Sequence, residues 1–72
     1  MTVGDAVHLS VNGDDHVLPS GTTVADLVAE LGLEPRGIAV AVDGEVVTRR
    51  TWADRRLHPG ARVEVLSIAQ GG

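Results

Sequence analysis

Apolar and polar residues alternate near the start of the chain. Val7, Leu9 and Val11 are separated by polar residues, and a period of two is typical of a strand with one buried face. Asn12-Gly13 comes next, and both residues tolerate the positive φ angles of a tight hairpin turn. The pattern therefore predicts a hairpin whose return strand covers residues 16–18.

The apolar spacing then changes to that of a helix. Thr22 or Thr23 is placed to cap its start, and Gly32 suits the left-handed residue that often follows a helix. Asp26 lies in the first turn, where the helix dipole favours an acid, and Pro35 prevents the helix from resuming. The helix is expected to have about two to three turns. Its apolar stripe, at i, i+3, i+4 and i+7, consists of Val24, Leu27, Val28 and Leu31.

The second half of the chain contains another hairpin and a final strand. An unbroken apolar run rich in β-branched residues indicates a central strand covered on one or both faces. The elements predicted here, in chain order, are a strand at residues 38–42, a turn at Asp43-Gly44, a strand at 45–48, a short helical turn within 51–56, a type II turn at Pro59-Gly60 and a strand at 62–68.

This order of elements predicts an α+β fold. One main helix lying across one face of a mixed sheet of four to five strands buries both the helix stripe and one strand face. A crossover through the helix makes the first and last strands parallel neighbours at the centre, which is the β-grasp, or ubiquitin-like, arrangement. We expect one domain over residues 1–68, with disorder at residues 1–5, and a flexible tail at residues 69–72.

Composition excludes several kinds of chemistry. The 72 residues include no cysteine and no lysine, which excludes disulfides, thiolate catalysis, Schiff-base chemistry and a P-loop lysine. The net charge of −4 argues against a nucleic-acid partner. With no signal peptide and no apolar run of about 20 residues, we expect a cytoplasmic protein that does not enter a membrane. The five arginines in residues 49–62 are expected to face water, with contact to a charged partner as the alternative.

Side-chain constellations give no catalytic or metal site. His8, His16 and His58 lack the spacing of metal ligands. The three serines have no recognisable nucleophile motif. Trp52, the one aromatic residue, is expected to cover the edge of the core rather than to stack on a base.

The most specific pattern combines a hairpin with the end of the chain. The hairpin at residues 40–47, the spacing Arg49-x-x-Trp52 and an end at Gln70-Gly71-Gly72 resemble the ThiS family, the sulfur carriers of the thiamine pathway. The resemblance covers essentially the whole chain from residue 7 onward. The sequence departs from the family in Thr48, where proline is frequent, and in Ala61, where an acidic turn residue is frequent.

The resemblance implies a function for the tail. The Gly72 carboxylate would be adenylated by an E1-like, ThiF-type enzyme and converted to a thiocarboxylate, which would donate sulfur to a ThiG-type thiazole synthase. ATP and Mg²⁺ would be bound by the activating enzyme, so no cofactor is expected on this chain, which would act as a co-substrate and not as an enzyme. Gly71, with Gln70 before it, would give the tail access to a narrow channel because glycine has no Cβ. The free carrier is expected to be a monomer.

The last strand has apolar residues on both faces. Val63 and Val65 point one way, while Leu66 and Ile68 point the other way. We expect one of Leu66 and Ile68 to remain partly exposed as a docking contact for the activating enzyme. The alternative is that both complete the core of this small domain.

Two other functions remain open at this point. Carriers of molybdopterin or cysteine biosynthesis use the same tail chemistry in another pathway. A β-grasp binding module with an inert tail would use no such chemistry.

Overall fold

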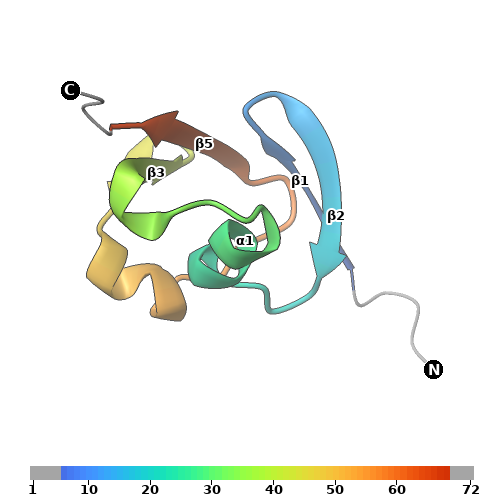
Figure 1. Cartoon of the computed structure of the whole chain (residues 1–72). Coiled ribbons are helices and arrows are strands. Elements are labelled where there is room, and N and C mark those ends of the chain that lie inside the picture. Colours follow the sequence, from blue (N-terminus) through green and yellow to red (C-terminus); the bar gives the residue numbers. More distant parts are fainter. Residues whose placement is uncertain (1–5, 69–72) are drawn as a thin grey trace.

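Five strands form one mixed sheet in the computed structural model, which describes residues 6–68 (Figure 1). The strands are β1 (Ala6–Val11), β2 (Asp14–Pro19), β3 (Ile38–Val42), β4 (Glu45–Val47) and β5 (Arg62–Ser67). Their order is β2-β1-β5-β3-β4, in which β1 and β5 are parallel and the other neighbours are antiparallel. The predicted α+β arrangement is therefore confirmed, with five strands and a parallel pair at the centre. The predicted disordered start and flexible tail, residues 1–5 and 69–72, lie outside the described residues.

The helix α1 (Val24–Glu30) lies across one face of this sheet (Figure 1). Thr23 caps it, because its hydroxyl accepts the Asp26 N–H and the Asp26 carboxylate accepts the Thr23 N–H, both at 3.1 Å. Gly32 ends the helix in the predicted left-handed conformation, with a φ of 69°. None of the helices in residues 6–68 has the length and apolar character needed to cross a bilayer. The helix residues that are fully buried are Val24, Leu27 and Val28.

Two-residue turns close both hairpins. The φ angles are 52° at Asn12 and 89° at Gly13, and 53° at Asp43 and 86° at Gly44. Positive φ at both central positions is the mark of a type I′ turn, whose twist matches that of the strands it joins. Because the first turn is so short, β2 starts directly after Gly13. The predicted start of this strand at residue 16 is therefore wrong.

The core lies between α1 and the sheet. Trp52 is 4% exposed, and its indole N–H donates to the Val47 carbonyl at 2.8 Å. The prediction that Trp52 covers the core is thus confirmed. The buried apolar residues are Val7, Leu9, Val11, Val24, Leu27, Val28, Val40, Val42, Val47, Trp52, Leu57, Ala61 and Val63.

The connection between β4 and β5 is more regular and more buried than predicted. A 3₁₀ turn, η2 (Arg49–Asp54), begins earlier than expected because the Thr48 carbonyl accepts the Thr51 N–H at 2.9 Å. β4 accordingly ends one residue before the predicted boundary. Leu57 and Ala61 carry no periodic signal, yet they are 3% and 0% exposed. Residue 61 is therefore a core position rather than an exposed turn position.

A polar clamp joins the β3–β4 turn to the loop before β5. The Asp43 carboxylate accepts the Arg62 backbone N–H at 2.9 Å and lies 2.6 Å from His58 Nε2. His58 Nδ1 lies 2.9 Å from the Pro59 carbonyl O, so only the imidazolium form donates to both acceptors. The Arg62 N–H and then His58 lower the pKa of Asp43, whereas Asp43 and then the Pro59 carbonyl raise the pKa of His58. The sequence does not reveal this pair because its members lie on separate turns, 15 residues apart.

We expect the free energy of unfolding to fall as the pH rises above the ordinary histidine pKa of 6.5. The folded state holds the His58 proton more tightly, so its contribution is complete below pH 6.5 and is lost through the raised folded pKa. The contribution of Asp43 is present above its ordinary pKa of 3.8 and is lost as the pH falls through the lowered folded pKa. The clamp is therefore strongest between these two values.

Urea unfolding of the wild type and of His58→Gln at pH values between about 5 and 8 measures this effect. Glutamine retains a hydrogen-bond donor but does not titrate in this range, so the variant should show a flatter dependence on pH. An unchanged slope in His58→Gln would assign the pH dependence to another group.

Candidate functional site at the end of β5

β5 is the element that leads to the predicted tail. On one edge it pairs with β3 from Val63 to Ser67, whereas on the other edge its pairing with β1 stops at Val63. Ile68, just beyond the strand, donates its N–H to the carbonyl of Gly37 at 2.9 Å. Gly37 ends a short 3₁₀ turn, η1 (Pro35–Gly37), that precedes β3. The chain is thus held to the start of β3 up to the last described residue.

The side chain of Asn12 continues the pairing of β5 beyond the end of β1. Its Oδ1 accepts the Val65 N–H at 2.8 Å, and its Nδ2 donates to the Val65 carbonyl at 3.2 Å. The Asn12 backbone N–H also donates to the Val63 carbonyl at 2.8 Å. The left-handed turn carries the backbone away from β5 at this point, and the side-chain amide replaces the missing strand. Asn12 therefore supports the free edge of β5 where the strand approaches the tail.

Both of the predicted docking residues are exposed. Leu66 is 61% exposed and Ile68 is 51% exposed. On the opposite face of β5, Val63 is buried and Val65 packs partly against the core. The structure therefore excludes the alternative in which both Leu66 and Ile68 complete the core, and it exposes two residues where one was expected.

The open face of the sheet carries further apolar residues next to Leu66. In the register of the sheet, Ala39 lies opposite Leu66, and Ala41 lies opposite Val46. Val46 is 73% exposed. We call Ala39, Ala41, Val46 and Leu66, with Ile68 at the end, the apolar strip. Ala39, Ala41 and Val46 are not identified by sequence reasoning, because which face each residue occupies depends on the strand register.

The remaining predicted site residues are not placed by the structure. Gln70, Gly71 and Gly72 lie outside the described residues. Within residues 6–68, no group of three or more histidine and acidic side chains is arranged to hold a metal ion. His58, one of the three histidines without metal-ligand spacing, pairs with Asp43. The described part of the candidate site is thus an exposed apolar surface on the open face of the sheet.

The sequence matches the ThiS family over residues 4–72. It is 36% identical over 62 residues to the sulfur carrier protein ThiS of Thermus thermophilus, covering 86% of this chain and 95% of that protein. It is also 30% identical over 64 residues to a thiazole synthase of Paramagnetospirillum magneticum and 35% identical over 66 residues to one of Magnetococcus marinus. The matches cover 89% and 92% of this chain, but the chain spans only 20% of each thiazole synthase.

Two solved structures have a similar fold. The crystal structure of the thiamine biosynthesis protein ThiS from Geobacter metallireducens superposes with a TM-score of 0.76 at 26% identity, covering 92% of this chain and 100% of that one. The solution structure of a designed protein based on human erythrocytic ubiquitin superposes with a TM-score of 0.57 at 21% identity, covering 94% and 96%. The second likeness supports the fold alone.

The five-stranded sheet with α1 across one face defines a ubiquitin-like β-grasp protein. Within this class, the chain belongs to the ThiS family. The family resemblance predicted from the hairpin, the Arg49-x-x-Trp52 spacing and the tail is therefore confirmed.

Replacing Asn12 with glycine should loosen the free edge of β5. Glycine keeps the left-handed turn without strain but removes both side-chain bonds to Val65, so we expect a loss of about 1 kcal/mol in unfolding free energy. The exchange of the Val65 amide hydrogen should become several-fold faster, as measured by NMR.

Asn12→Asp is the matched control, because aspartate tolerates the same φ and keeps the acceptor for the Val65 N–H. It should preserve more of the Val65 protection than Asn12→Gly does. Equal exchange at Val65 in the wild type and in Asn12→Gly would show that the side chain does not support β5.

Proposed function

We propose that this chain carries sulfur as a C-terminal thiocarboxylate for the formation of the thiazole ring of thiamine. The observation that carries the proposal is the family match over residues 4–72, together with the similarity to a sulfur carrier protein of nearly the same length. The protein supplies the acyl group and no catalytic residue. It acts as a co-substrate of partner enzymes.

The proposed chemistry takes place at the Gly72 carboxylate. A carboxylate oxygen attacks the α-phosphorus of ATP on an E1-like, ThiF-type partner that also binds Mg²⁺, and pyrophosphate leaves. Hydrosulfide, or another donor of sulfide-level sulfur, then attacks the acyl carbon of the adenylate, AMP leaves, and the resulting thiocarboxylic acid loses its proton to give the thiocarboxylate. Gly71 and Gly72 suit this step because the absence of a Cβ lets the chain thread a narrow site and leaves the carbonyl open to attack.

The similarity to segments of two thiazole synthases supports a thiazole synthase as the second partner, which accepts the sulfur. In two such proteins, a segment similar to this chain belongs to the same polypeptide as the remaining four-fifths of the enzyme. Covalent linkage of a carrier segment to a synthase is expected where the two work together, because it raises their effective concentration. This favours a ThiG-type thiazole synthase as the sulfur acceptor over the enzymes of molybdopterin or cysteine synthesis.

The apolar strip is the proposed docking surface for the activating enzyme. Its members lie beside the strand that leads to the tail, and three of them, Val46, Leu66 and Ile68, are more than half exposed. Exposed apolar residues gathered on one face are typical of a contact surface. β5 then links the two functions, because docking of its open face brings the end of the chain toward the partner's nucleotide site.

Incubation with ATP, Mg²⁺, a sulfur donor and the purified adenylating enzyme should convert the Gly72 carboxylate to a thiocarboxylate. Intact-mass spectrometry should show a gain equal to the difference between one sulfur and one oxygen atom. Deletion of Gly72 should abolish this gain without a change in thermal stability, because the described core runs from Val7 to Val63. An unchanged mass in the wild type, under conditions that charge the carrier of Thermus thermophilus, would contradict the proposal.

Leu66→Asp and Ile68→Asp should each raise the KM for charging by about tenfold, with little change in Tm. Both side chains are more than half exposed, so the loss should fall on partner binding rather than on folding. Val17→Asp is the matched control, since Val17 is 59% exposed on the edge strand β2 and lies outside the strip. A KM equal to that of the control would remove Leu66 and Ile68 from the docking surface, and a large drop in Tm would indicate a structural role.

A further inference from the structure

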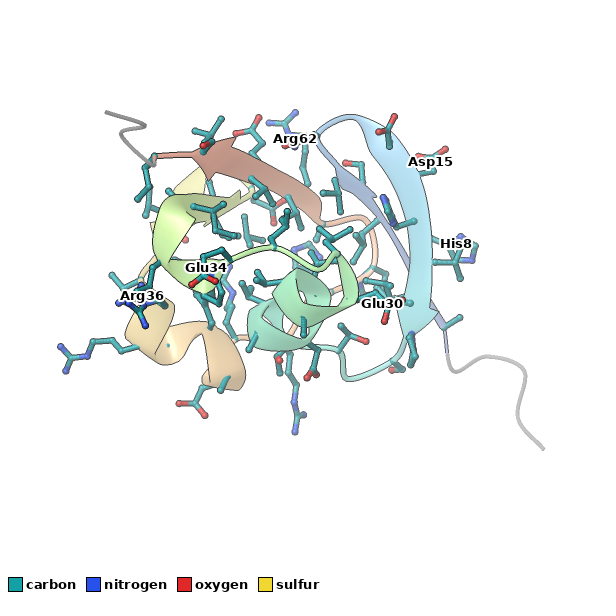
Figure 2. All side chains as sticks on the ribbon, in the orientation of Figure 1. His8, Asp15, Glu30, Glu34, Arg36 and Arg62 are labelled. Atoms are coloured by element: carbon teal, nitrogen blue, oxygen red, sulfur yellow. The ribbon has the colours of Figure 1, made fainter. Side chains whose placement is uncertain are left out.

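Three arginines come together at the end of the sheet where β5 finishes. β3 begins and β4 ends there, because these antiparallel strands pair with Val40 opposite Val47. Arg36 precedes β3 within η1, and Arg49 and Arg50 open η2 after β4. Figure 2 shows Arg36 beside the η2 turn. We call Arg36, Arg49 and Arg50 the arginine corner.

No side chain in residues 6–68 forms an ion pair or a hydrogen bond with the three guanidinium groups of this corner. All three arginines are exposed, and the one ion pair among the described residues joins His58 to Asp43. The side-chain hydrogen bonds of the described chain involve none of the three guanidinium groups. Each guanidinium therefore presents its planar set of donors to the solvent.

The rest of the molecule has the opposite charge. The net charge is −4. In Figure 2, Asp15 of β2 and Glu30 of α1 lie on the side of the molecule away from Arg36, whereas Glu34 is labelled close to Arg36. A long polyanion such as a nucleic acid would meet these acids, which disfavours it as a partner. A compact acidic patch on a folded protein could contact the three arginines and, of the acids labelled in Figure 2, would meet only Glu34.

The corner is continuous with the surface that leads to the tail. Arg36 is adjacent in sequence to Gly37, whose carbonyl accepts the Ile68 N–H at 2.9 Å. On the sheet, Ser67 pairs with Ile38, the first residue of β3. A partner that receives the end of β5 therefore reaches the corner from the same end of the sheet.

We propose that the arginine corner binds carboxylates on the surface of the adenylating enzyme and so orients the carrier as it docks. This inference rests on the proposed function, from which it takes the identity of the partner. Arginine pairs with carboxylates in a planar, two-bonded geometry that sets orientation as well as attraction. Because the corner lies at the rim of the apolar strip, its main effect falls on the rate of association.

The test compares Arg49→Glu/Arg50→Glu with Arg55→Glu/Arg56→Glu. Both pairs change the net charge equally, but residues 55 and 56 lie by the start of α1, where the Arg55 carbonyl accepts the Val24 N–H and Arg56 pairs with Thr23. Stopped-flow association with the purified adenylating enzyme should slow about tenfold for the corner variant at low ionic strength and less than about twofold for the control. In about 0.5 M salt the difference should vanish. Arg36→Glu should show the same salt-sensitive effect, and it serves as the test if the double variant fails to fold.

Equal slowing of both double variants would assign the effect to net charge and overturn the proposal. If the corner variant associated at the wild-type rate and differed only in its rate of dissociation from the enzyme, with no dependence on salt, that result would also contradict the proposal. If ATP alone, without the enzyme, changed the NMR chemical shifts of Arg36, Arg49 and Arg50, the corner would be a phosphate site and the proposal would be wrong. Charging of the wild type at saturating enzyme separates the two proposals. If the wild type is charged and the corner variant associates normally, only the proposed role of the arginine corner is wrong. If the wild type neither binds the enzyme nor is charged, the proposed function is wrong as well.

Discussion

The pairing of β5 between β1 and β3 is the constraint on which the remaining structure depends. It joins the last strand to the first hairpin and to the second hairpin, so the first and last strands of the described chain are neighbours in one sheet. One face of β5 is committed to the core through Val63, which leaves Leu66 and Ile68 on the open side. Within the described residues, this pairing holds β5 on both edges up to Val63 and on its β3 edge up to Ser67.

Much of the fold could be predicted because its turns and helix ends use residues that favour the positive φ angles these positions require. Asn12-Gly13 and Asp43-Gly44 take the positive φ angles that such pairs favour, and Gly32 ends α1 in the same region. The apolar periods of two and of i, i+3, i+4 then place the hairpins and the helix in order. The helix across the sheet follows, because one apolar stripe and one apolar strand face have to cover each other.

The parts that could not be predicted depend on contacts between distant segments. Leu57 and Ala61 are buried without any periodic pattern, because the segment after η2 packs against the rest of the core as a loop. Ala39 and Val46 join the surface beside Leu66 only once the register of three strands is known. The sequence identifies Asn12 only as a turn residue, because its side-chain hydrogen bonds to Val65 join positions 53 residues apart.

The two edges of the sheet decide where another chain is able to attach. β4 is only three residues long, and β2 carries adjacent acids at its start and a proline at its end. Short strands, charges and prolines all discourage another strand from adding to an open edge. The addition of further strands, which leads to fibrous aggregates, is therefore disfavoured at both edges of the sheet. The apolar strip can therefore stay exposed on the face of the sheet while neither edge offers a template for another strand.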